Sequence, residues 1–182
     1  MNALRFDENQ PLELDTRKRL YKIIEKSPGL HFREIQRRSG IAVGSLQYHL
    51  DYLQKHDFLT MQKEGKFVRY YAMRTKKIVE DKPLMALLRQ EQPRHILLFL
   101  LQRKFATNER IAEEVQLSQS TTSAYLKKMA EAGAIQKRKS GRKTHFLVGN
   151  KEKVVELLAT YKKSFLDGLV DNFVDVWQEV GK

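Results

Sequence analysis

The sequence predicts a mainly α-helical fold with small β-hairpins, of the α+β class, in which two similar domains precede a long C-terminal helix. Three observations lead to this prediction. Residues 41–73 align without a gap on residues 117–149, so each position pairs with one 76 positions later. In both segments the apolar residues change from helical to strand-like spacing at the same point. Basic residues are concentrated around both segments, and an internal repeat takes precedence over composition when a fold is assigned.

The repeat divides the 182 residues into five expected parts. Two small domains are expected rather than one larger domain, because the same module occurs twice. The parts are an N-terminal extension (1–14), a first domain (15–74), a linker with a short helix (75–91), a second domain (92–150) and a C-terminal helix (151–182).

The first domain is predicted to contain three helices followed by a β-hairpin. Asp15 is the expected N-cap of the first helix. Leu46, Leu50 and Leu53 recur at helical spacing and mark the buried face of the third helix. The strands are rich in β-forming residues and are separated by a turn at Gly65. The expected helices span residues 15–26, 31–39 and 43–56, and the expected strands span residues 58–63 and 67–73.

The second domain is predicted to repeat this order. Thr107 and Ser118 are the expected N-caps of its second and third helices. The third helix, residues 119–132, turns Leu126 and Met129 inward. Strands are expected at 135–139 and 143–148, with a turn at 140–142 between them.

Residues 151–180 are predicted to form one long helix, with Gly168 and Asn172 as points where it can bend. Apolar residues recur there at steps of three and four over roughly four heptads, which is typical of a helix that packs along a seam. Two alternatives remain open for this helix. It pairs with a second copy of the chain, or it folds back to cover apolar surface of its own domains. The residues expected to carry a homodimer contact are Phe165, Leu169, Phe173 and Trp177.

The order helix, helix, helix, strand, basic turn, strand is that of a winged helix-turn-helix domain. Such a domain presents its third helix to the major groove of DNA and its hairpin, the wing, to the backbone. The expected recognition helices are residues 43–56 and 119–132, and the expected wings are residues 63–69 and 137–143. The alternative is that these are ordinary solvated surfaces. The candidate DNA-binding residues are Arg37, Arg38, Gly44, Ser45, Gln47, Tyr48, Lys66 and Arg69 in the first domain, and Ser118, Gln119, Ser120, Thr121, Ser123, Lys127, Lys128, Lys139, Arg142 and Lys143 in the second.

Charge favours a polyanionic partner. The net charge is +12, and residues 15–74 and 92–150 each contribute +7 while the remainder is near neutral. Basic residues near phosphates release condensed counterions, which favours binding to nucleic acid. The two copies nevertheless differ, because Asp51 occupies the position of Lys127. We therefore expect the second copy to bind DNA chiefly through its helix and wing, and the first copy to dock differently or to serve another partner.

Other classes of protein fit poorly. The chain has no cysteine, which excludes disulfides and thiolate metal sites. The apolar run at 96–101 is far shorter than the roughly 20 residues that span a bilayer, so we expect a soluble, cytoplasmic, nucleoid-associated protein. The five histidines are scattered, so no metal or cofactor is expected. Residues 140–144 lack the spacing of a phosphate loop, and with no other catalytic motif we expect no enzyme.

The segment SLQYHLDYLQKHDFLTMQKEGKFVRYYAM resembles the recognition helix and wing of archaeal and bacterial regulators of the ArsR/MarR kind. The segment SQSTTSAYLKKMAEAGAIQKRKSGRKTHFLV is similar to the same family, and the paired arrangement resembles archaeal regulators with two such domains in one chain. The resemblance implies a regulator of transcription that binds double-stranded DNA. Metal-sensing members carry ligand sets on a terminal helix, and the terminal helix of this chain has neither Cys nor His.

Three functions are therefore distinguished. The leading interpretation is a sequence-specific transcription regulator. A weakly specific architectural protein of chromatin, which coats or bridges duplexes through backbone contacts alone, is the first alternative. A winged-helix adaptor that binds another protein is the second.

Overall fold

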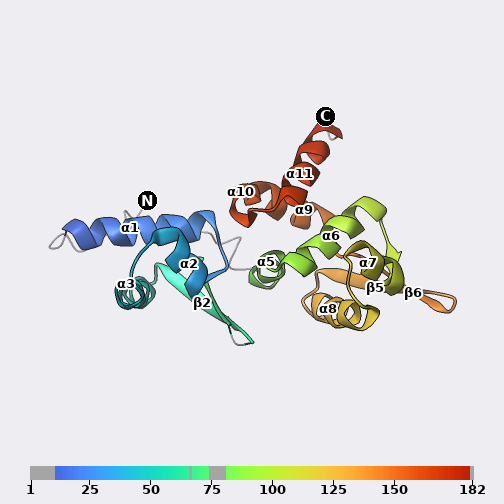
Figure 1. The fold of residues 1–182 in the computed structure, drawn as a ribbon, viewed down its shortest axis with the longest axis horizontal. Coiled ribbons are helices and arrows are strands. Elements are labelled where there is room, and N and C mark those ends of the chain that lie inside the picture. The colour runs from blue at the N-terminus through green and yellow to red at the C-terminus, as the bar shows by residue number, and fades with distance from the viewer. Residues whose placement is uncertain (1–10, 66, 74–80, 181–182) are drawn as a thin grey trace. The chain divides into compact units, whose positions relative to one another are not determined.

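The computed structural model describes residues 11–65, 67–73 and 81–180, which fall into two compact units, Met1–Lys82 and Pro83–Lys182. Each unit is built of helices around a small three-stranded antiparallel sheet (Figure 1). The expected mainly helical α+β fold with β-hairpins is confirmed. No helix in the described part of the chain is long and apolar enough to cross a membrane.

The first unit begins with a helix that starts earlier than expected, at Pro11, so the predicted N-cap at Asp15 is wrong. Its sheet has the order β1-β3-β2. The core is formed by the apolar faces of all three helices, with Leu20, Leu46 and Leu50 almost fully buried. The elements are α1 (Pro11–Lys26), β1 (Leu30–His31), α2 (Phe32–Ser39), α3 (Val43–Lys55), β2 (Leu59–Glu64) and β3 (Phe67–Ala72).

The second unit has the same sheet topology, β4-β6-β5. Helix α5 leads into it from the end of the first unit. Ile96, Leu100, Leu126 and Met129 lie in its core. The elements are α5 (Lys82–Leu88), α6 (Glu91–Arg103), β4 (Ala106–Thr107), α7 (Asn108–Glu114), α8 (Gln119–Glu131), β5 (Ile135–Ser140) and β6 (Lys143–Val148).

The offset of 76 residues seen in the sequence holds in the structure. Helix α8 and strands β4, β5 and β6 each begin and end 76 positions after α3, β1, β2 and β3. The tight turns coincide as well, since the same positions carry a left-handed backbone. The pairs with positive φ are Gly40 (68°) with Gln116 (54°), Asp57 (58°) with Gly133 (71°), and Gly65 (57°) with Gly141 (59°).

Side-chain caps fix where the helices of the second unit begin. Thr107 accepts a hydrogen bond from the backbone N–H of Arg110 at 3.4 Å, and Ser118 accepts one from Thr121 at 3.2 Å. Both expected N-caps are thereby confirmed. A cap of this kind satisfies a backbone donor that the helix itself leaves without a partner. In the first unit, His31 and Glu34 form a reciprocal capping box at the start of α2, which was not predicted.

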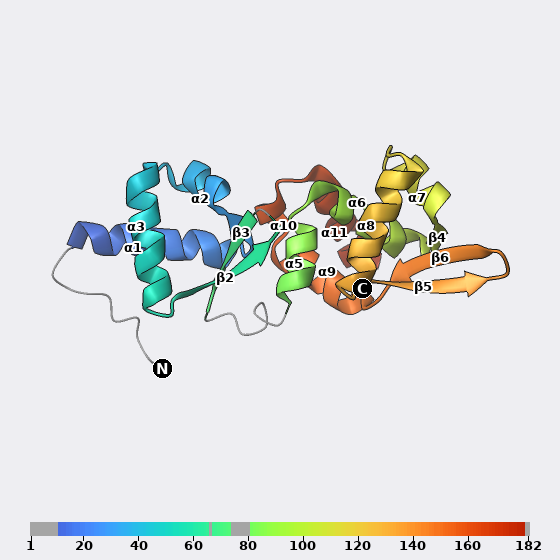
Figure 2. The ribbon, with the colours of Figure 1, turned by 90° about the horizontal axis from the view of Figure 1, so that it is seen from below.

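The prediction of a single long C-terminal helix is wrong. Helices α9 (Lys151–Thr160), α10 (Lys162–Phe165) and α11 (Gly168–Val180) replace it. The chain reverses at Leu166, whose φ of 55° is left-handed, and Asp167 then accepts a hydrogen bond from the backbone N–H of Leu169 at 3.0 Å. Helix α11 packs against α6 and α9, so the tail folds back on the second unit (Figure 2).

A charged cluster fastens this tail to the start of the second unit. The Asp167 carboxylate lies 2.5 Å from Arg94 Nη2 and 2.9 Å from His95 Nε2. Arg94 also donates to the backbone carbonyl of Leu88 at 2.8 Å. Arg89 adds two hydrogen bonds to Ser164, at 2.8 and 2.9 Å. Because the side chains of Arg94 and Asp167 are both nearly buried, losing either partner would leave the other charge without compensation.

Candidate nucleic-acid interface

Helix α8 presents small polar side chains at its first turn. The Ser118 hydroxyl lies 3.0 Å from the hydroxyl of Ser120 and 2.8 Å from that of Thr121. Thr122, Leu126 and Met129 are buried, and they fix which side of the helix faces solvent. The sequence-predicted residues exposed on that side are Gln119, Ser120, Thr121, Ser123, Lys127 and Lys128.

The two lysines of α8 differ in their surroundings. Lys128 Nζ lies 3.4 Å from the side-chain oxygen of Gln90, so part of its hydrogen-bonding capacity is used within the unit. Lys127 is exposed and has no such contact among the described residues. Lys127 is therefore the better placed of the two to meet a phosphate.

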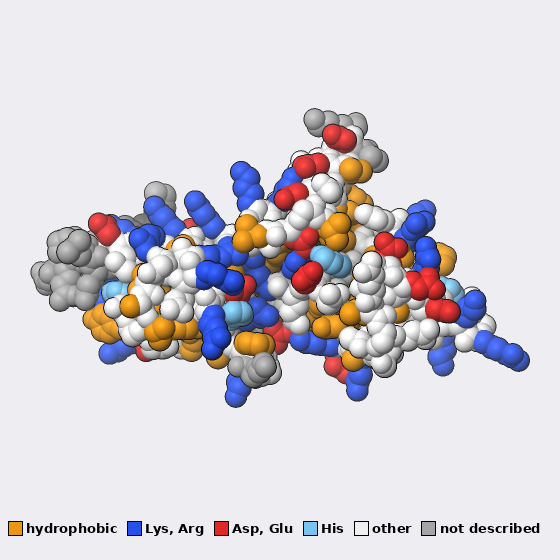
Figure 3. Space-filling model, in the orientation of Figure 1, with side chains coloured by type: hydrophobic (Ala, Val, Ile, Leu, Met, Phe, Trp, Pro, Cys, Tyr) orange, Lys and Arg blue, Asp and Glu red, His pale blue; other side chains and the backbone are white. Residues whose placement is uncertain are grey.

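The second wing carries a dense group of exposed cations. Five basic residues occupy seven positions of the β5–β6 hairpin, and Lys and Arg side chains project from the hairpin in Figure 3. None of the five forms an ion pair with a carboxylate in the described part of the chain. Unpaired like charges repel one another, and an anionic partner would relieve that repulsion. The five residues are Lys137, Arg138, Lys139, Arg142 and Lys143.

Helix α3 has a similar exposed start but engages its longer side chains within the unit. Gly44 and Ser45 are exposed, and a side chain at Gly44 would meet open space. Gln47 donates a hydrogen bond to Asp51 at 2.8 Å. Arg17 donates to the Tyr48 hydroxyl at 3.4 Å and lies over the ring of Tyr52. Contact with bases by Gln47 or Tyr48 would require breaking these contacts.

The first wing offers fewer cations than expected. Arg69 is 5% exposed, and its guanidinium contacts the Glu64 carboxylate at 2.5 Å and the Gly29 carbonyl at 2.8 Å. Arg69 is therefore engaged within the fold, which argues against a contact between its side chain and DNA. Lys66 lies outside the described residues. Phe67 and Val68 are exposed on this wing.

The arginines of helix α2 also differ. Arg37 is exposed and has no polar contact within the described residues. Arg38 donates a hydrogen bond to the Ser27 hydroxyl at 2.9 Å, and burial lowers the pKa of its guanidinium from the ordinary value. Arg37 is thus the freer of the two expected phosphate contacts.

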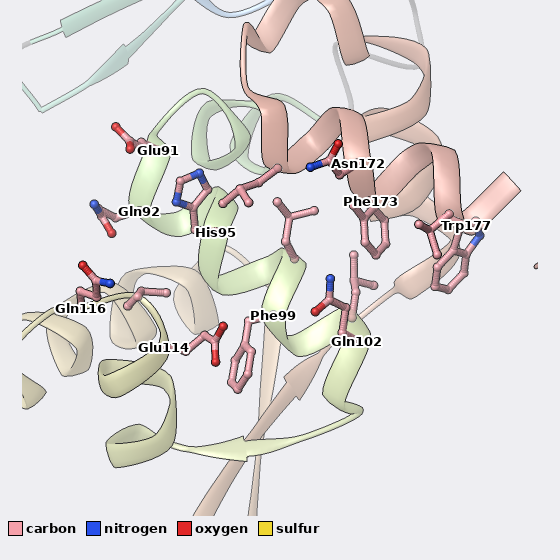
Figure 4. A pocket seen from close by; sticks show the side chains of 15 residues that line it. Glu91, Gln92, His95, Phe99, Gln102, Glu114, Gln116, Asn172, Phe173 and Trp177 are labelled. Carbon is pink, nitrogen blue, oxygen red and sulfur yellow. The ribbon is translucent and has the colours of Figure 1, made fainter. Parts of the chain in front are cut away.

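Three of the four expected dimer residues line a pocket of about 790 Å³ between α6, the end of α7 and α11 (Figure 4). Leu169 and Trp177 are about half exposed, whereas Phe173 is nearly buried beneath Trp177. Phe165 does not line the pocket. It is half-buried against the guanidinium groups of Arg89 and Arg94, at 4.7 and 5.6 Å from its ring centre, and is better explained as part of the fold.

One further apolar residue of this region was not among the expected dimer residues, although the apolar spacing of the C-terminal segment includes it. Val176 is 59% exposed and lies beside Trp177 on the lining of the pocket. Polar side chains such as Gln102 and Asn172 also line the pocket, and the apolar spacing gives no sign of them. No group of three or more metal-binding side chains occurs in the described part of the chain.

Comparison with protein families gives a separate match for each half of the chain, as the structure gives two units. A family model described as an N-terminal helix-turn-helix domain matches residues 14–81. A second model, described as winged helix-turn-helix DNA-binding, matches residues 89–136, a range that contains α6, α7 and α8. The chain therefore carries two helix-turn-helix domains in tandem. The family matched by the second domain is described as a DNA-binding one.

A curated relative has a similar sequence over most of this chain. It is an uncharacterized HTH-type transcriptional regulator of the archaeon Methanocaldococcus jannaschii, 29% identical over 142 residues, which are 78% of this chain. The matched part is 35% of the relative, so this tandem winged helix-turn-helix chain corresponds to about a third of that protein.

Solved structures resemble parts of the tandem winged helix-turn-helix chain. Reduced HlyU from Vibrio cholerae is 23% identical, with a TM-score of 0.42, and the match covers 47% of this chain and 90% of that one. The transcriptional repressor PagR of Bacillus anthracis is 22% identical, with a TM-score of 0.41 and coverage of 46% and 97%.

Proposed function

We propose that this chain regulates transcription by binding double-stranded DNA, and that its second domain supplies most of the affinity. The observation that carries the proposal is the combination, in one domain, of an exposed polar helix start with five unpaired cations on the wing. Each feature alone is common on protein surfaces. Together, at the positions where a winged helix-turn-helix domain meets DNA, they match its two kinds of contact.

In this proposal the start of α8 enters the major groove. Ser120 and Ala124 are small and exposed, so the backbone of the helix can approach the bases closely. Gln119 and Ser123 are exposed next to them and would read base edges, because amide and hydroxyl groups match the donors and acceptors presented there. Lys127, further along the helix, would contact a phosphate.

The wing would add contacts to the backbone of the duplex. The β-turn at Ser140–Lys143 places Arg142 and Lys143 next to the tip of the hairpin, with Gly141 supplying the left-handed turn residue at φ 59°. Cations at this place would reach phosphates or the minor groove without reading sequence. Affinity should consequently fall steeply as salt is raised.

The test is selection of bound sequences from a random duplex library, followed by competition between a selected duplex and its scrambled version. A shared motif and strong preference for the selected duplex are expected. An affinity ratio near one would instead favour an architectural protein of chromatin. If no duplex binds even at low salt, the result would favour a winged-helix adaptor that binds another protein.

A second function is proposed for the first domain, which has a different surface. Four large apolar or aromatic side chains are more than a third exposed there: Val43 and Tyr48 on α3, and Phe67 and Val68 on the wing. Arg69, by contrast, is buried and donates a hydrogen bond to the Gly29 carbonyl. Exposed apolar side chains at these positions suit a protein partner better than a phosphate backbone. Crosslinking in nuclease-treated lysate, with Phe67→Ser as the comparison, tests this function.

We also propose a homodimer through α11, although its contact differs from the seam expected from the sequence. Leu169, Val176 and Trp177 are exposed large apolar residues around one pocket. A second copy would cover them and bury the open side of that pocket. Two copies would then present paired domains to a pseudo-palindromic site.

A further inference from the structure

A small pocket of about 380 Å³ lies on the second unit, away from helix α8. It opens on one face of the β5–β6 hairpin, beside the loop that joins α6 to β4 and the first residue of α9. No residue of α8 contributes to it. Its lining consists of Lys104, Phe105, Arg138, Ser140, His145, Leu147 and Lys151.

The lining is strongly cationic. Lys104, Arg138 and Lys151 come from three different elements, and no carboxylate is among the lining residues. None of the three forms an ion pair within the described part of the chain. Three cations that line one pocket without a counter-charge favour a multiply charged anion, and the oxygens of a phosphate group can accept charge-assisted hydrogen bonds from such side chains.

The register of the hairpin explains why these side chains share one face. Arg138 pairs with His145 across the two strands. Side chains alternate between the two faces of a sheet, so Ser140 and Leu147 join this pair. Lys104 ends α6 with a φ of 65°, which turns the chain sharply before Phe105. The site is therefore assembled on regular strands and a fixed turn.

The first domain has a side-chain ion pair at the corresponding place. His145, Ser140 and Phe105 stand 76 positions after Arg69, Glu64 and Gly29. In the first domain, Arg69 occupies the space by contacting both the Glu64 carboxylate and the Gly29 carbonyl. The second copy lacks both partners of that ion pair, and His145 and Ser140 line a pocket instead.

An aromatic side chain forms one wall of this pocket. Phe105 is 59% exposed, and its ring meets His145 edge-on, with 5.3 Å between the ring centres. A phenylalanine with so much exposed surface adds little to the fold, because burial is the main source of its stabilising effect. Its accessible face suits a flat ring, since aromatic side chains stack on nucleic-acid bases.

We propose that this pocket binds a mononucleotide, with its phosphates against Lys104, Arg138 and Lys151 and its base against Phe105. The volume lies at the low end of the roughly 300–1,000 Å³ of small-molecule sites, which suits a ligand of this size. The pocket involves no residue of α8, and Arg138 is the one wing cation that it shares with the proposed DNA contacts. It gives the second domain a binding activity that the first domain, with its internal ion pair, lacks.

Calorimetric titration of the full chain with ADP, and separately with inorganic phosphate, tests the proposal. We expect one site per chain, with ADP binding at least tenfold more tightly than phosphate. Phe105→Ala should weaken ADP by about tenfold and leave phosphate unchanged. Lys104→Glu should weaken both ligands by at least about tenfold, since it removes a charge-assisted contact and adds repulsion. Lys163→Glu, an exposed change on α10, is the matched control.

Duplex binding by the same variants distinguishes a free nucleotide from a phosphate of the DNA backbone. Lys104→Glu and Phe105→Ala should change duplex affinity by less than twofold relative to Lys163→Glu. The proposal is overturned if ADP does not bind, if ADP and phosphate bind equally, or if Lys104→Glu behaves like the control. It is also overturned if both variants weaken duplex binding as much as ADP binding, which would assign the pocket to the DNA backbone. Unchanged melting temperatures establish that the variants are folded.

Discussion

Arg69 and Glu64 form a salt bridge within the first domain, with 2.5 Å between Nε and Oε2. At the same positions of the second domain stand His145 and Ser140, 76 residues later. The first wing thus uses an arginine to stabilise its own fold, whereas the second wing has no such pair and keeps its cations exposed. This difference separates the functions that we propose for the two domains.

Replacing Arg69 should damage the fold rather than DNA binding. Arg69→Ala removes the ion pair with Glu64 and the hydrogen bond to the Gly29 carbonyl, and loss of one member of a largely buried pair costs about 3 kcal/mol. We expect urea denaturation to show the first domain unfolding at lower urea. If the variant folds normally but its duplex affinity depends less steeply on salt, Arg69 contacts DNA and the prediction is contradicted.

Removing cations from the second wing should weaken binding to all duplexes alike. For Arg142→Ala with Lys143→Ala, we expect the slope of log affinity against log salt to fall by about 2, near one unit for each phosphate contact. Fluorescence anisotropy over a series of salt concentrations measures this slope, with Lys163→Ala as the control. An unchanged slope would exclude phosphate contact by these two residues.

The Asp167 cluster predicts a pH-dependent contribution to stability. Burial opposes the charged form, but hydrogen bonds from Arg94 and His95 outweigh it and lower the pKa of Asp167 from its ordinary value of 3.8. A lowered folded-state pKa gives stability that is present above the ordinary pKa and lost as pH falls through the folded value. Asp167→Asn should therefore destabilise the second unit at pH 7, by about 3 kcal/mol.

Thermal unfolding of Asp167→Asn and the natural chain at several pH values provides the measurement. We expect the difference between them to shrink as the solution becomes more acidic than about pH 4. A difference that is the same at every pH would mean that the carboxylate charge contributes nothing. In that case, the contribution of Asp167 to stability would come from the hydrogen bond that it accepts from the backbone N–H of Leu169 at the start of α11.

The proposed dimer can be separated from the fold of α11. Leu169 and Val176 are exposed, so replacing both with glutamate should leave the monomer folded and shift the chain to a monomer in light scattering. Phe173→Glu, at a buried position, is expected instead to destabilise the second unit. A natural chain that scatters as a monomer at high concentration would contradict the dimer.

Much of each domain could be predicted from the sequence, because the third helix and the hairpin are specified by local spacing. Leu46, Leu50 and Leu53 fixed α3 to within one residue at its end, and Leu126 and Met129 did the same for α8. The two-residue strands β1 and β4 were missed, since they are too short to show any periodicity. They exist because an adjacent strand supplies their hydrogen bonds.

The C-terminal region shows where the apolar spacing was insufficient. Steps of three and four persist on both sides of Asp167, so the pattern gives no sign that the helix ends there. Asp167-Gly168 is itself a turn signal, and it decided the local structure. The burial of Arg69 was beyond sequence reasoning as well, because its partner Gly29 lies 40 positions away.

The most direct test compares the two domains within one protein. Duplex affinity would be measured at low and moderate salt for Lys127→Ala with Lys128→Ala, and for Arg37→Ala with Lys63→Ala, each removing two exposed cations. We predict that the second-domain pair lowers affinity for every duplex and flattens the salt dependence, with a much smaller effect from the first-domain pair. Equal losses, or a larger loss from the first-domain pair, would contradict the assignment of DNA binding chiefly to the second domain.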